Sequence, residues 1–227
     1  MRRIRVTGLG LTAYRDVLAL QRELQARRRE AGGRDWLLLT EHQPVITLGR
    51  THPEPSLRVP ASDVAGRGIE IVQTERGGDI TYHGPGQLVA YGIIDLKAWG
   101  LGVIDYVTGL EEAVILTCAD FGVTAGRRPA ARGAWVGERK VASVGVNVRR
   151  WVTMHGIALN VRGDEAHWAL IEPCGMTGVD ATSIAAESHG DVLVPEVAAR
   201  FRGHFADVFG CVVDQAEAPN LPSAATV

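Results

Sequence analysis

Residues 76–91 read RGGDITYHGPGQLVAY, and the first thirteen of them contain four glycines, one proline, one arginine and one histidine. Glycine has no Cβ atom and therefore lets a backbone approach a ligand or another backbone closely. Peptide N–H groups that such a segment leaves free can also bind an anion. The glycines follow neither the G-x-G-x-x-G order of a dinucleotide loop nor the G-K-[ST] ending of a P-loop. The segment therefore predicts a close-approach site whose ligand the glycines do not identify.

Arg76 and His83 are the side chains of this segment best suited to take part in chemistry. The guanidinium of Arg76 could bind an anionic group, or it could form a structural ion pair with Glu75 or Asp79. His83 could be a buried core histidine, a hydrogen-bonding wall residue or a general base. The residues of this segment leave these alternatives open.

Apolar residues on either side of this segment recur with the spacings of strands and helices. The run from 35 to 50 indicates two strands around a turn at 43–44, and its continuous apolar first half is typical of a strand buried on both faces. Residues 133–148 alternate as a hairpin that turns at 137–139. Further strands are expected at 4–6, 69–73, 88–96 and 151–161, and helices from a Thr12 cap onward, at 103–121 and at 195–209.

Strands and helices mix along the chain without strict alternation, which favours an α+β or mixed α/β fold over a doubly wound parallel sheet. We expect a mixed β-sheet core with flanking helices. No repeat or linker divides the chain, so residues 1–214 are expected to form one domain. The small and polar residues at 215–227 are expected to be a disordered tail.

The composition of the whole chain excludes several classes of protein. Its 227 residues are 46% hydrophobic and carry a net charge of −2, without the basic excess that nucleic-acid binding needs. No apolar run approaches the ~18 residues of a membrane span. The first residues, MRRIRVTGLGL, are too polar for a signal peptide, so a cytoplasmic protein is expected. The seven histidines are scattered without metal-ligand spacing, and we expect neither a metal nor another cofactor.

The three cysteines, Cys118, Cys174 and Cys211, cannot all pair and have no C-x-x-C spacing, which argues against a disulfide framework and a zinc site. Cys118 falls on the apolar stripe of the helix expected at 103–121, and Cys211 lies in an apolar stretch, so both are expected in the core. Cys174 lies instead in EPCGMTG at 172–178, where a proline and two glycines favour an exposed turn. Cys174 is therefore the candidate nucleophile.

Lys140 is one of only two lysines in a chain that uses arginine freely. An ammonium group, unlike a guanidinium, can lose its proton, so a lysine at this position can act as an acid or a base. A nearby ammonium also favours the thiolate form of a cysteine. The alternative is an ordinary solvated lysine on the hairpin.

Five segments together resemble the lipoyl(octanoyl) transferase family. They are EHQPVITLGR (41–50), RGGDITYHGPGQLVAY (76–91), GERKVASVGV (137–146), HGIALNV (155–161) and PCGMTGV (173–179). They follow the family's order and spacing and span most of the chain between residues 35 and 185. The resemblance implies a single domain with the fold of the biotin and lipoate protein ligases. It also implies transfer of an octanoyl group from octanoyl-acyl carrier protein to a lysine of a lipoyl domain.

The resemblance also implies roles for particular residues. Cys174 matches the cysteine that carries the acyl group as a thioester, and Lys140 matches the lysine that lowers the pKa of that thiol. Three further segments match those that hold the acyl chain: Arg76, Gly77, Gly78, Asp79, Ile80, Thr81, Tyr82 and His83; Ser143, Val144 and Gly145; Gly156, Ile157 and Ala158. The glycine-rich segment is then expected to form the wall of a tunnel for an unbranched acyl chain, with His83 as a wall residue.

The implied partners are octanoyl-acyl carrier protein as donor and two kinds of acceptor. These acceptors are the lipoyl domains of 2-oxoacid dehydrogenase E2 subunits and the H protein of glycine cleavage, which a monomer would meet transiently. Three other functions stay open: an ATP-dependent lipoate ligase of the same fold, a thioesterase, and a catalytically silent module that binds lipoyl domains. The ligase would need no cysteine, so Cys174 in its PCG setting argues against it.

Overall fold

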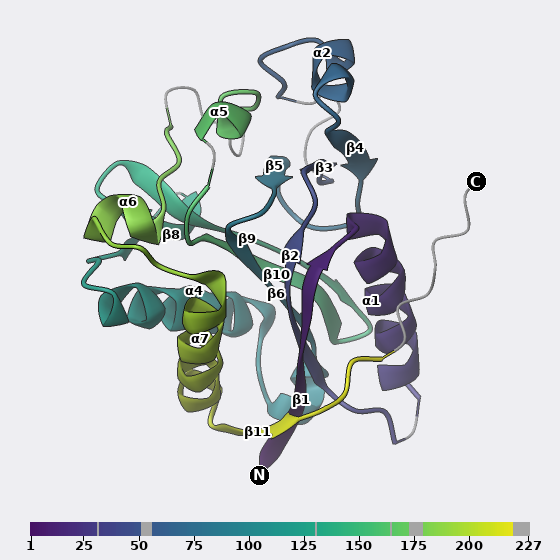
Figure 1. The fold of residues 1–227 in the computed structure, drawn as a ribbon. Coiled ribbons are helices and arrows are strands. Elements are labelled where there is room, and N and C mark those ends of the chain that lie inside the picture. The colour runs from purple at the N-terminus through teal and green to yellow at the C-terminus, as the bar shows by residue number, and fades with distance from the viewer. Residues whose placement is uncertain (31, 51–55, 130, 164, 173–178, 220–227) are drawn as a thin grey trace.

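The computed structural model describes residues 1–30, 32–50, 56–129, 131–163, 165–172 and 179–219, which fold around a mixed sheet (Figure 1). In chain order the elements are β1 (Arg2–Thr12), α1 (Tyr14–Arg28), β2 (Trp36–His42), β3 (Val45–Leu48), α2 (Ala61–Gly66), β4 (Glu70–Gln73), β5 (Ile80–His83), β6 (Gln87–Ile93), α3 (Leu96–Trp99), α4 (Val103–Asp120), β7 (Gly126–Arg128), β8 (Ala131–Val136), β9 (Arg139–Arg149), β10 (Val152–Asn160), α5 (Glu165–Trp168), α6 (Ile184–Ser188), α7 (Val194–Phe209) and β11 (Cys211–Gln215).

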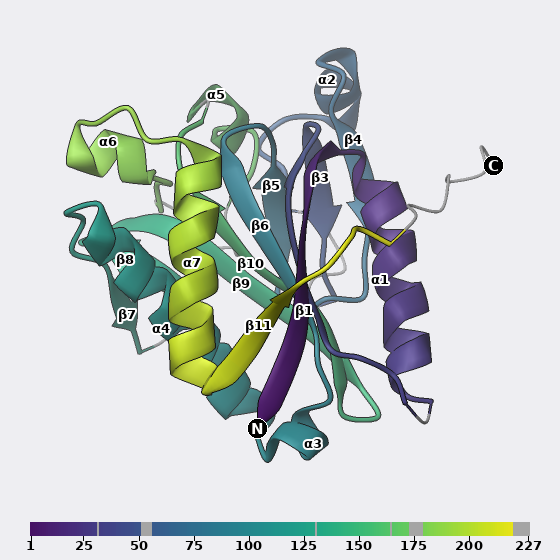
Figure 2. The same ribbon diagram turned by 60° about the horizontal axis from the view of Figure 1, so that its bottom comes forward.

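The main sheet has eight strands in the order β11-β1-β2-β6-β10-β9-β8-β7. The first three run parallel, and every later pairing, from β2–β6 to β7–β8, is antiparallel. At one edge β11 lies along β1, with Arg2 opposite Cys211 and Val6 opposite Gln215, so segments from the two ends of the described chain lie side by side (Figure 2).

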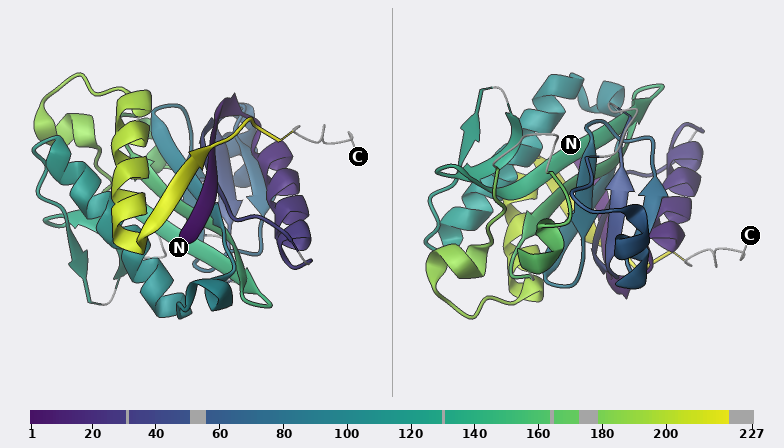
Figure 3. Two further views of the ribbon diagram at one scale, coloured as in Figure 1. Left: turned by 90° about the horizontal axis from the view of Figure 1, so that it is seen from below. Right: turned by 90° about the horizontal axis from the view of Figure 1, so that it is seen from above.

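Helices cover both faces of this sheet, α4 and α7 on one side and α1 on the other (Figure 3). Strand β2 shows why both faces are filled. Leu37 and Leu39 belong to the apolar cluster under α4 and α7, whereas Leu38 belongs to the cluster under α1. The continuous apolar run of this strand is therefore buried on both faces, as its sequence predicts.

A second, three-stranded sheet has the order β4-β3-β5, with β3 parallel to β4 and antiparallel to β5. It has its own apolar cluster, which includes Ile46, Val64, Ile80 and Leu170. The glycine-rich segment at 76–79 lies where the two sheets meet: the Gly49 N–H, just after β3, donates to the Asp79 carbonyl, and the Gly77 N–H donates to the Val146 carbonyl of β9 in the main sheet. This arrangement positions the site described below.

The structure confirms the predicted mixed α+β architecture and most of the predicted elements. The β8–β9 hairpin turns at Gly137 and Glu138, as predicted. The expected Thr12 cap is wrong: Thr12 ends β1, Ala13 is the N-cap of α1, and the Thr12 hydroxyl is 2.8 Å from the Thr40 hydroxyl. β11 includes Gln215, the first residue of the predicted tail, and residues 220–227 lie outside the described residues. In the described ranges, no helix has the length and apolar character to cross a membrane.

Candidate active site

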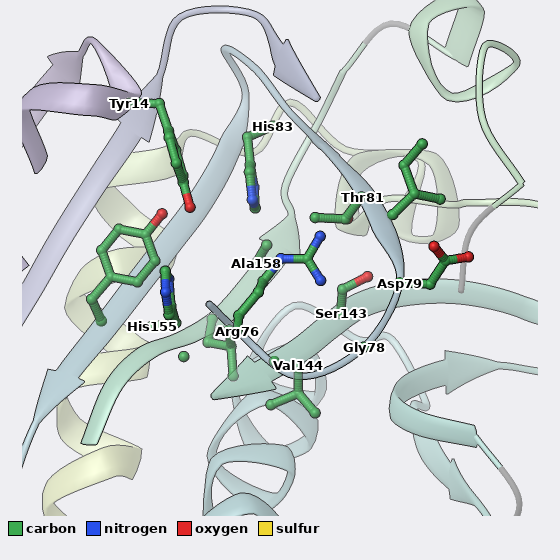
Figure 4. Close-up of a pocket in the computed structure, with 15 residues that line it drawn as sticks. Tyr14, Arg76, Gly78, Asp79, Thr81, His83, Ser143, Val144, His155 and Ala158 are labelled. Carbon is green, nitrogen blue, oxygen red and sulfur yellow. The ribbon is translucent and has the colours of Figure 1, made fainter. Parts of the chain in front are cut away.

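A narrow cavity lies between the glycine-rich segment, the main sheet and the start of α1 (Figure 4). The empty space in and at the mouth of this cavity, open solvent included, is about 470 Å³. Its lining comes from α1, from the segment that leads into β5, and from β5, β6, β9 and β10. The lining residues are Tyr14, Arg76, Gly78, Asp79, Ile80, Thr81, His83, Tyr91, Ser143, Val144, Gly145, His155, Gly156, Ile157 and Ala158.

Close backbone approach explains the glycines around the cavity, as the sequence predicts for the 76–91 segment. The Gly77 N–H donates to the carbonyl of Val146, with an N–O distance of 2.9 Å. A Cβ atom on Gly145 would lie 2.9 Å from the Gly77 oxygen. A Cβ atom on Gly156 would lie 2.1 Å from the backbone oxygen of Ala90. Side chains at these positions would force the strands and the 76–78 segment apart, so the glycines let the cavity wall form.

Arg76 and Asp79 stiffen the glycine-rich segment. The Arg76 guanidinium is buried and donates to the Thr47 carbonyl at 2.5 Å, to the Thr47 hydroxyl at 3.0 Å and to the Gly77 carbonyl at 3.1 Å. The Asp79 carboxylate accepts a hydrogen bond from the Ser56 hydroxyl at 2.7 Å. These contacts bind the segment to Thr47 of β3 and to Ser56.

A cluster of five buried rings, the His–Tyr cluster, closes one end of the cavity: Tyr14, His42, His83, Tyr91 and His155. Figure 4 draws Tyr14, His83 and His155 on one side of the site and Asp79 and Ser143 on the other. Tyr14 stacks on His83 with ring centroids 5.8 Å apart, and Tyr91 meets His155 edge to face at 6.2 Å.

Hydrogen bonds fix two of the cluster's histidines. Atom Nε2 of His42 is 2.8 Å from the Tyr91 hydroxyl, and Nδ1 of His83 is 2.7 Å from the Gln87 amide oxygen. Burial lowers the pKa of His42 to about 4 and that of His83 to about 3. Both rings are therefore neutral at pH 7.

His155 differs from the other members of the cluster. Its side chain is 2% exposed, and neither ring nitrogen has a hydrogen-bond partner among the described residues. Its φ angle of 62° lies in the left-handed region, which residues with a Cβ atom adopt at a cost. The backbone N–H donates to the Gln21 side-chain oxygen at 2.8 Å. Burial lowers the pKa of His155 to about 4.

Lys140 is buried in β9, three residues before Ser143. Its ammonium lies 5.1 Å from the ring centre of Trp135, a cation–π distance. It lines a second hollow, on whose wall Gly78, Val144 and Gly145 also lie, so the two hollows share part of their walls. The alternative of a solvated hairpin lysine is therefore wrong.

The backbone of Lys140 is bonded to the chain that follows the candidate nucleophile. Its N–H donates to the Asp180 carbonyl and its carbonyl accepts from the Thr182 N–H, both at 2.9 Å. Cys174 itself lies outside the described residues, as do all of residues 173–178. Glu172, the residue just before 173–178, donates its backbone N–H to the Ser56 carbonyl at 2.8 Å.

The other two cysteines lie in the core, as predicted. Cys118 is buried on α4, and burial raises the pKa of its thiol to about 12. Cys211 is buried at the start of β11, and burial raises the pKa of its thiol to about 11. Neither thiol is therefore ionised near neutral pH.

The structure brings the predicted segments together, with two exceptions. Gly77 and Tyr82 do not line the cavity; the Tyr82 hydroxyl is 2.9 Å from Nδ1 of His167, in the apolar cluster of the small sheet. Three lining residues, Tyr14, Tyr91 and His155, are not among the predicted site residues. Tyr91 and His155 stand inside two of the quoted segments, but nothing in their residue types marks them as wall residues. In the part of the chain that is described, no three His, Cys, Asp or Glu side chains gather as metal ligands.

Comparisons with known proteins agree with this architecture. A family model described as the lipoyl protein ligase A/B catalytic domain matches residues 13–206. An octanoyltransferase of Solibacter usitatus is 46% identical over 209 residues, which cover 92% of this chain and 94% of that protein. The fold is similar to that of a putative lipoate protein ligase of T. acidophilum, solved with bound lipoic acid (TM-score 0.73, 16% identity, 95% of this chain and 89% of the other). A biotin protein ligase of Aquifex aeolicus, solved with biotin and ATP, is more distant (TM-score 0.55, 12% identity, covering 91% of this chain and 70% of the other).

Proposed function

The chain belongs to the lipoyl protein ligase A/B catalytic domain family, and from its 46% identity to an octanoyltransferase we infer that it is an acyltransferase that moves octanoyl groups in protein lipoylation. We further propose octanoyl-acyl carrier protein as the donor. The proposed acceptors are lipoyl domains, those of 2-oxoacid dehydrogenase E2 subunits and the H protein of glycine cleavage. The protein is proposed to act as a monomer in the cytoplasm.

The observation that carries the mechanism is the anchoring on both sides of residues 173–178. Glu172 is hydrogen-bonded to Ser56, whose hydroxyl in turn bonds the cavity residue Asp79. Asp180 is hydrogen-bonded to Lys140. The described residues on either side of 173–178 are thus bonded, through Ser56, to the Asp79 end of the cavity and, directly, to the backbone of Lys140. Because Cys118 and Cys211 are buried with raised pKa values, Cys174 is the cysteine best suited to be the nucleophile.

The first half-reaction exchanges one thioester for another. The Cys174 thiolate attacks the carbonyl carbon of the octanoyl thioester, the new C–S bond forms, and the bond to the carrier's sulfur breaks. The carrier leaves as a thiolate and takes a proton from solvent. Once acylation has removed the negative charge of Cys174, burial favours loss of the Lys140 proton to solvent, which leaves the neutral amine. The Lys140 ammonium favours the attacking thiolate by its charge. Since the bond broken and the bond formed are of the same kind, this exchange needs no ATP.

The second half-reaction forms an amide. The amine of the acceptor lysine attacks the enzyme's thioester, the C–N bond forms, and the Cys174 thiolate leaves. The attacking amine must lose a proton, and Lys140 in its neutral form is the proposed base. Arginine could supply the charge of the first half-reaction but not the base of the second.

The acyl chain is proposed to lie in the cavity between the two ends drawn in Figure 4. Its carbonyl would lie near Asp79 and Ser143, at the end where Asp79 is bonded to Ser56. Its methyl end would point toward the His–Tyr cluster. Ile80 and Ala158, both buried, supply apolar wall between these ends.

Intact-protein mass spectrometry tests the proposal. The enzyme is mixed with octanoyl-acyl carrier protein without ATP, and an added octanoyl mass that hydroxylamine removes and that maps to Cys174 is expected. Cys174→Ser should lose this adduct and at least about a thousandfold of transfer activity, because a hydroxyl is a much weaker nucleophile than a thiolate. Cys211→Ser is the matched control and should keep both. Full transfer activity in Cys174→Ser would refute the assignment.

The same experiment separates the alternative functions. Loading of free lipoate that requires ATP would indicate a lipoate ligase, and release of free octanoate without amide formation would indicate a thioesterase. Binding of a lipoyl domain without any adduct or transfer would indicate a silent binding module.

A further inference from the structure

We propose that His155 sets the length of the acyl chain that the cavity accepts, because its imidazole closes the inner end and a longer chain would have to displace it. This inference rests on the proposed function and defines its substrate class, straight acyl chains of octanoyl length. His155 is thus a specificity-determining residue of the wall.

Two independent features of His155 indicate a role beyond packing. Its ring lines the cavity with both nitrogens unpartnered among the described residues, and the nearest carboxylate oxygen, Oε2 of Glu75, is 4.0 Å from Nε2. A buried polar group that makes no hydrogen bond is unfavourable for folding. Its left-handed φ of 62° within β10 is also unfavourable for a residue with a Cβ atom. Such features gather at functional sites, where the surrounding structure holds them in place.

The surroundings of His155 hold the ring at a fixed depth. The backbone N–H of His155 donates to the Gln21 side-chain oxygen of α1. The next residue, Gly156, packs directly on the backbone of Ala90. Tyr91 contacts the ring edge to face. The ring is neutral at pH 7, since burial lowers the pKa of His155 to about 4, so an apolar chain end meets no charge there.

The register of β9 and β10 gives the depth of the cavity. Ser143 pairs with Ala158, and Val146 pairs with His155. Three residue steps, about 10 Å along the strands, therefore separate the Ser143 end of the cavity from the His155 end. An extended octanoyl chain, with carbon–carbon bonds of about 1.5 Å, spans about 9 Å. A chain whose carbonyl lies between Ser143 and Ala158 therefore ends at the His155 ring. A decanoyl chain is about 2.5 Å longer and would have to move that ring.

The test compares kcat/KM for octanoyl-, decanoyl- and dodecanoyl-acyl carrier protein in the full chain. We expect the wild type to favour octanoyl over decanoyl at least tenfold. His155→Gly removes the ring and suits the left-handed backbone, and the decanoyl-to-octanoyl ratio should rise at least tenfold. His155→Asn is the second variant, because asparagine also tolerates this backbone and is shorter than histidine. The matched control is His189→Gly, since His189 also has a left-handed φ, 56°, but is exposed at the end of α6.

The outcomes distinguish the inference from the proposed function. A raised decanoyl-to-octanoyl ratio in both His155 variants, with the wild-type ratio in His189→Gly, supports the inference. Octanoyl transfer by the wild type with an unchanged ratio in the His155 variants overturns the inference alone. A wild-type protein that transfers no acyl chain overturns the proposed function and the inference together.

Discussion

Acidification from pH 7 to pH 5 should strongly destabilise the fold, because three histidines are buried in neutral form. The pKa of His42 and His155 is lowered to about 4 and that of His83 to about 3, in each case chiefly by burial. In the unfolded chain an imidazole has a pKa of about 6.5. Between pH 6.5 and 4 the unfolded state therefore binds more protons than the folded state, and the free energy of unfolding falls as the pH falls.

The magnitude follows from these pKa values. At pH 5 each unfolded histidine has gained its proton while each folded one has not, which lowers the free energy of unfolding by about 2 kcal/mol per residue. Three residues together give about 6 kcal/mol, comparable with the whole stability of a typical domain. The loss for His42 and His155 levels off below pH 4, and that for His83 below pH 3. Other charged groups near the cluster are Glu75, Arg22 and Arg76.

Urea unfolding followed by tryptophan fluorescence at pH 7 and pH 5 measures this loss. His155→Asn supplies the internal check, since it removes one of the three groups and should reduce the loss from about 6 to about 4 kcal/mol. Equal unfolding free energies at the two pH values would refute the reasoning. A loss that His155→Asn leaves unchanged would show that His155 is not one of the groups responsible.

Three substitutions test other parts of the argument. Lys140→Arg keeps the positive charge but removes the proposed base. In single-turnover kinetics the rate of acylation should stay within about tenfold of wild type, whereas the rate of amide formation should fall at least a hundredfold. Equal slowing of both steps would exclude the base role. Gly156→Ala places a Cβ atom 2.1 Å from the Ala90 oxygen and should destabilise the fold by about 3 kcal/mol in urea unfolding; wild-type stability would show that β10 shifts freely. Asp35→Ala removes the partner of the largely buried Arg28 guanidinium, 2.6 Å away, and the acceptor of the Trp99 indole N–H, 2.8 Å away, and should cost about 3–5 kcal/mol. An unchanged melting temperature would contradict the burial of these contacts.

Local patterns in the sequence predict the elements but not how distant elements pair. The continuous apolar run of β2 is buried on both faces as predicted. On α4 the predicted apolar stripe is buried at Val107, Leu110, Val114 and Cys118, whereas Val103 at its start is exposed. The pairing of β11 with β1 and the separate β4-β3-β5 sheet depend on partners that no local pattern specifies. Thr12 illustrates the same limit, since a residue suited to a helix cap ends a strand and bonds Thr40 instead.

The residues of the candidate site likewise include some that residue type predicts and others that only the packing of distant elements places there. The glycines of the 76–91 segment predict close backbone approach from residue type alone, and Gly77 makes such an approach to Val146. The close packing of Gly145 and Gly156 on the Gly77 and Ala90 backbones is not predicted from residue type. His155 could not be predicted as the inner wall, because its left-handed backbone and its unpartnered ring arise only from packing between α1 and β10. Residue type indicates what a side chain can do, whereas its depth in the cavity is set by strand register.

The pairing of β11 with β1 has a consequence for synthesis on the ribosome. Arg2 donates to the carbonyl of Phe209, 207 residues away in sequence, and β1 lies between β11 and β2. Until residues 211–215 have emerged, β1 is an open edge strand with unpaired backbone groups, the kind of edge that recruits other chains. Contacts of such sequence separation also form slowly. The nascent chain is therefore expected to be most prone to aggregation in the interval before β11 is made, and most dependent on chaperones then.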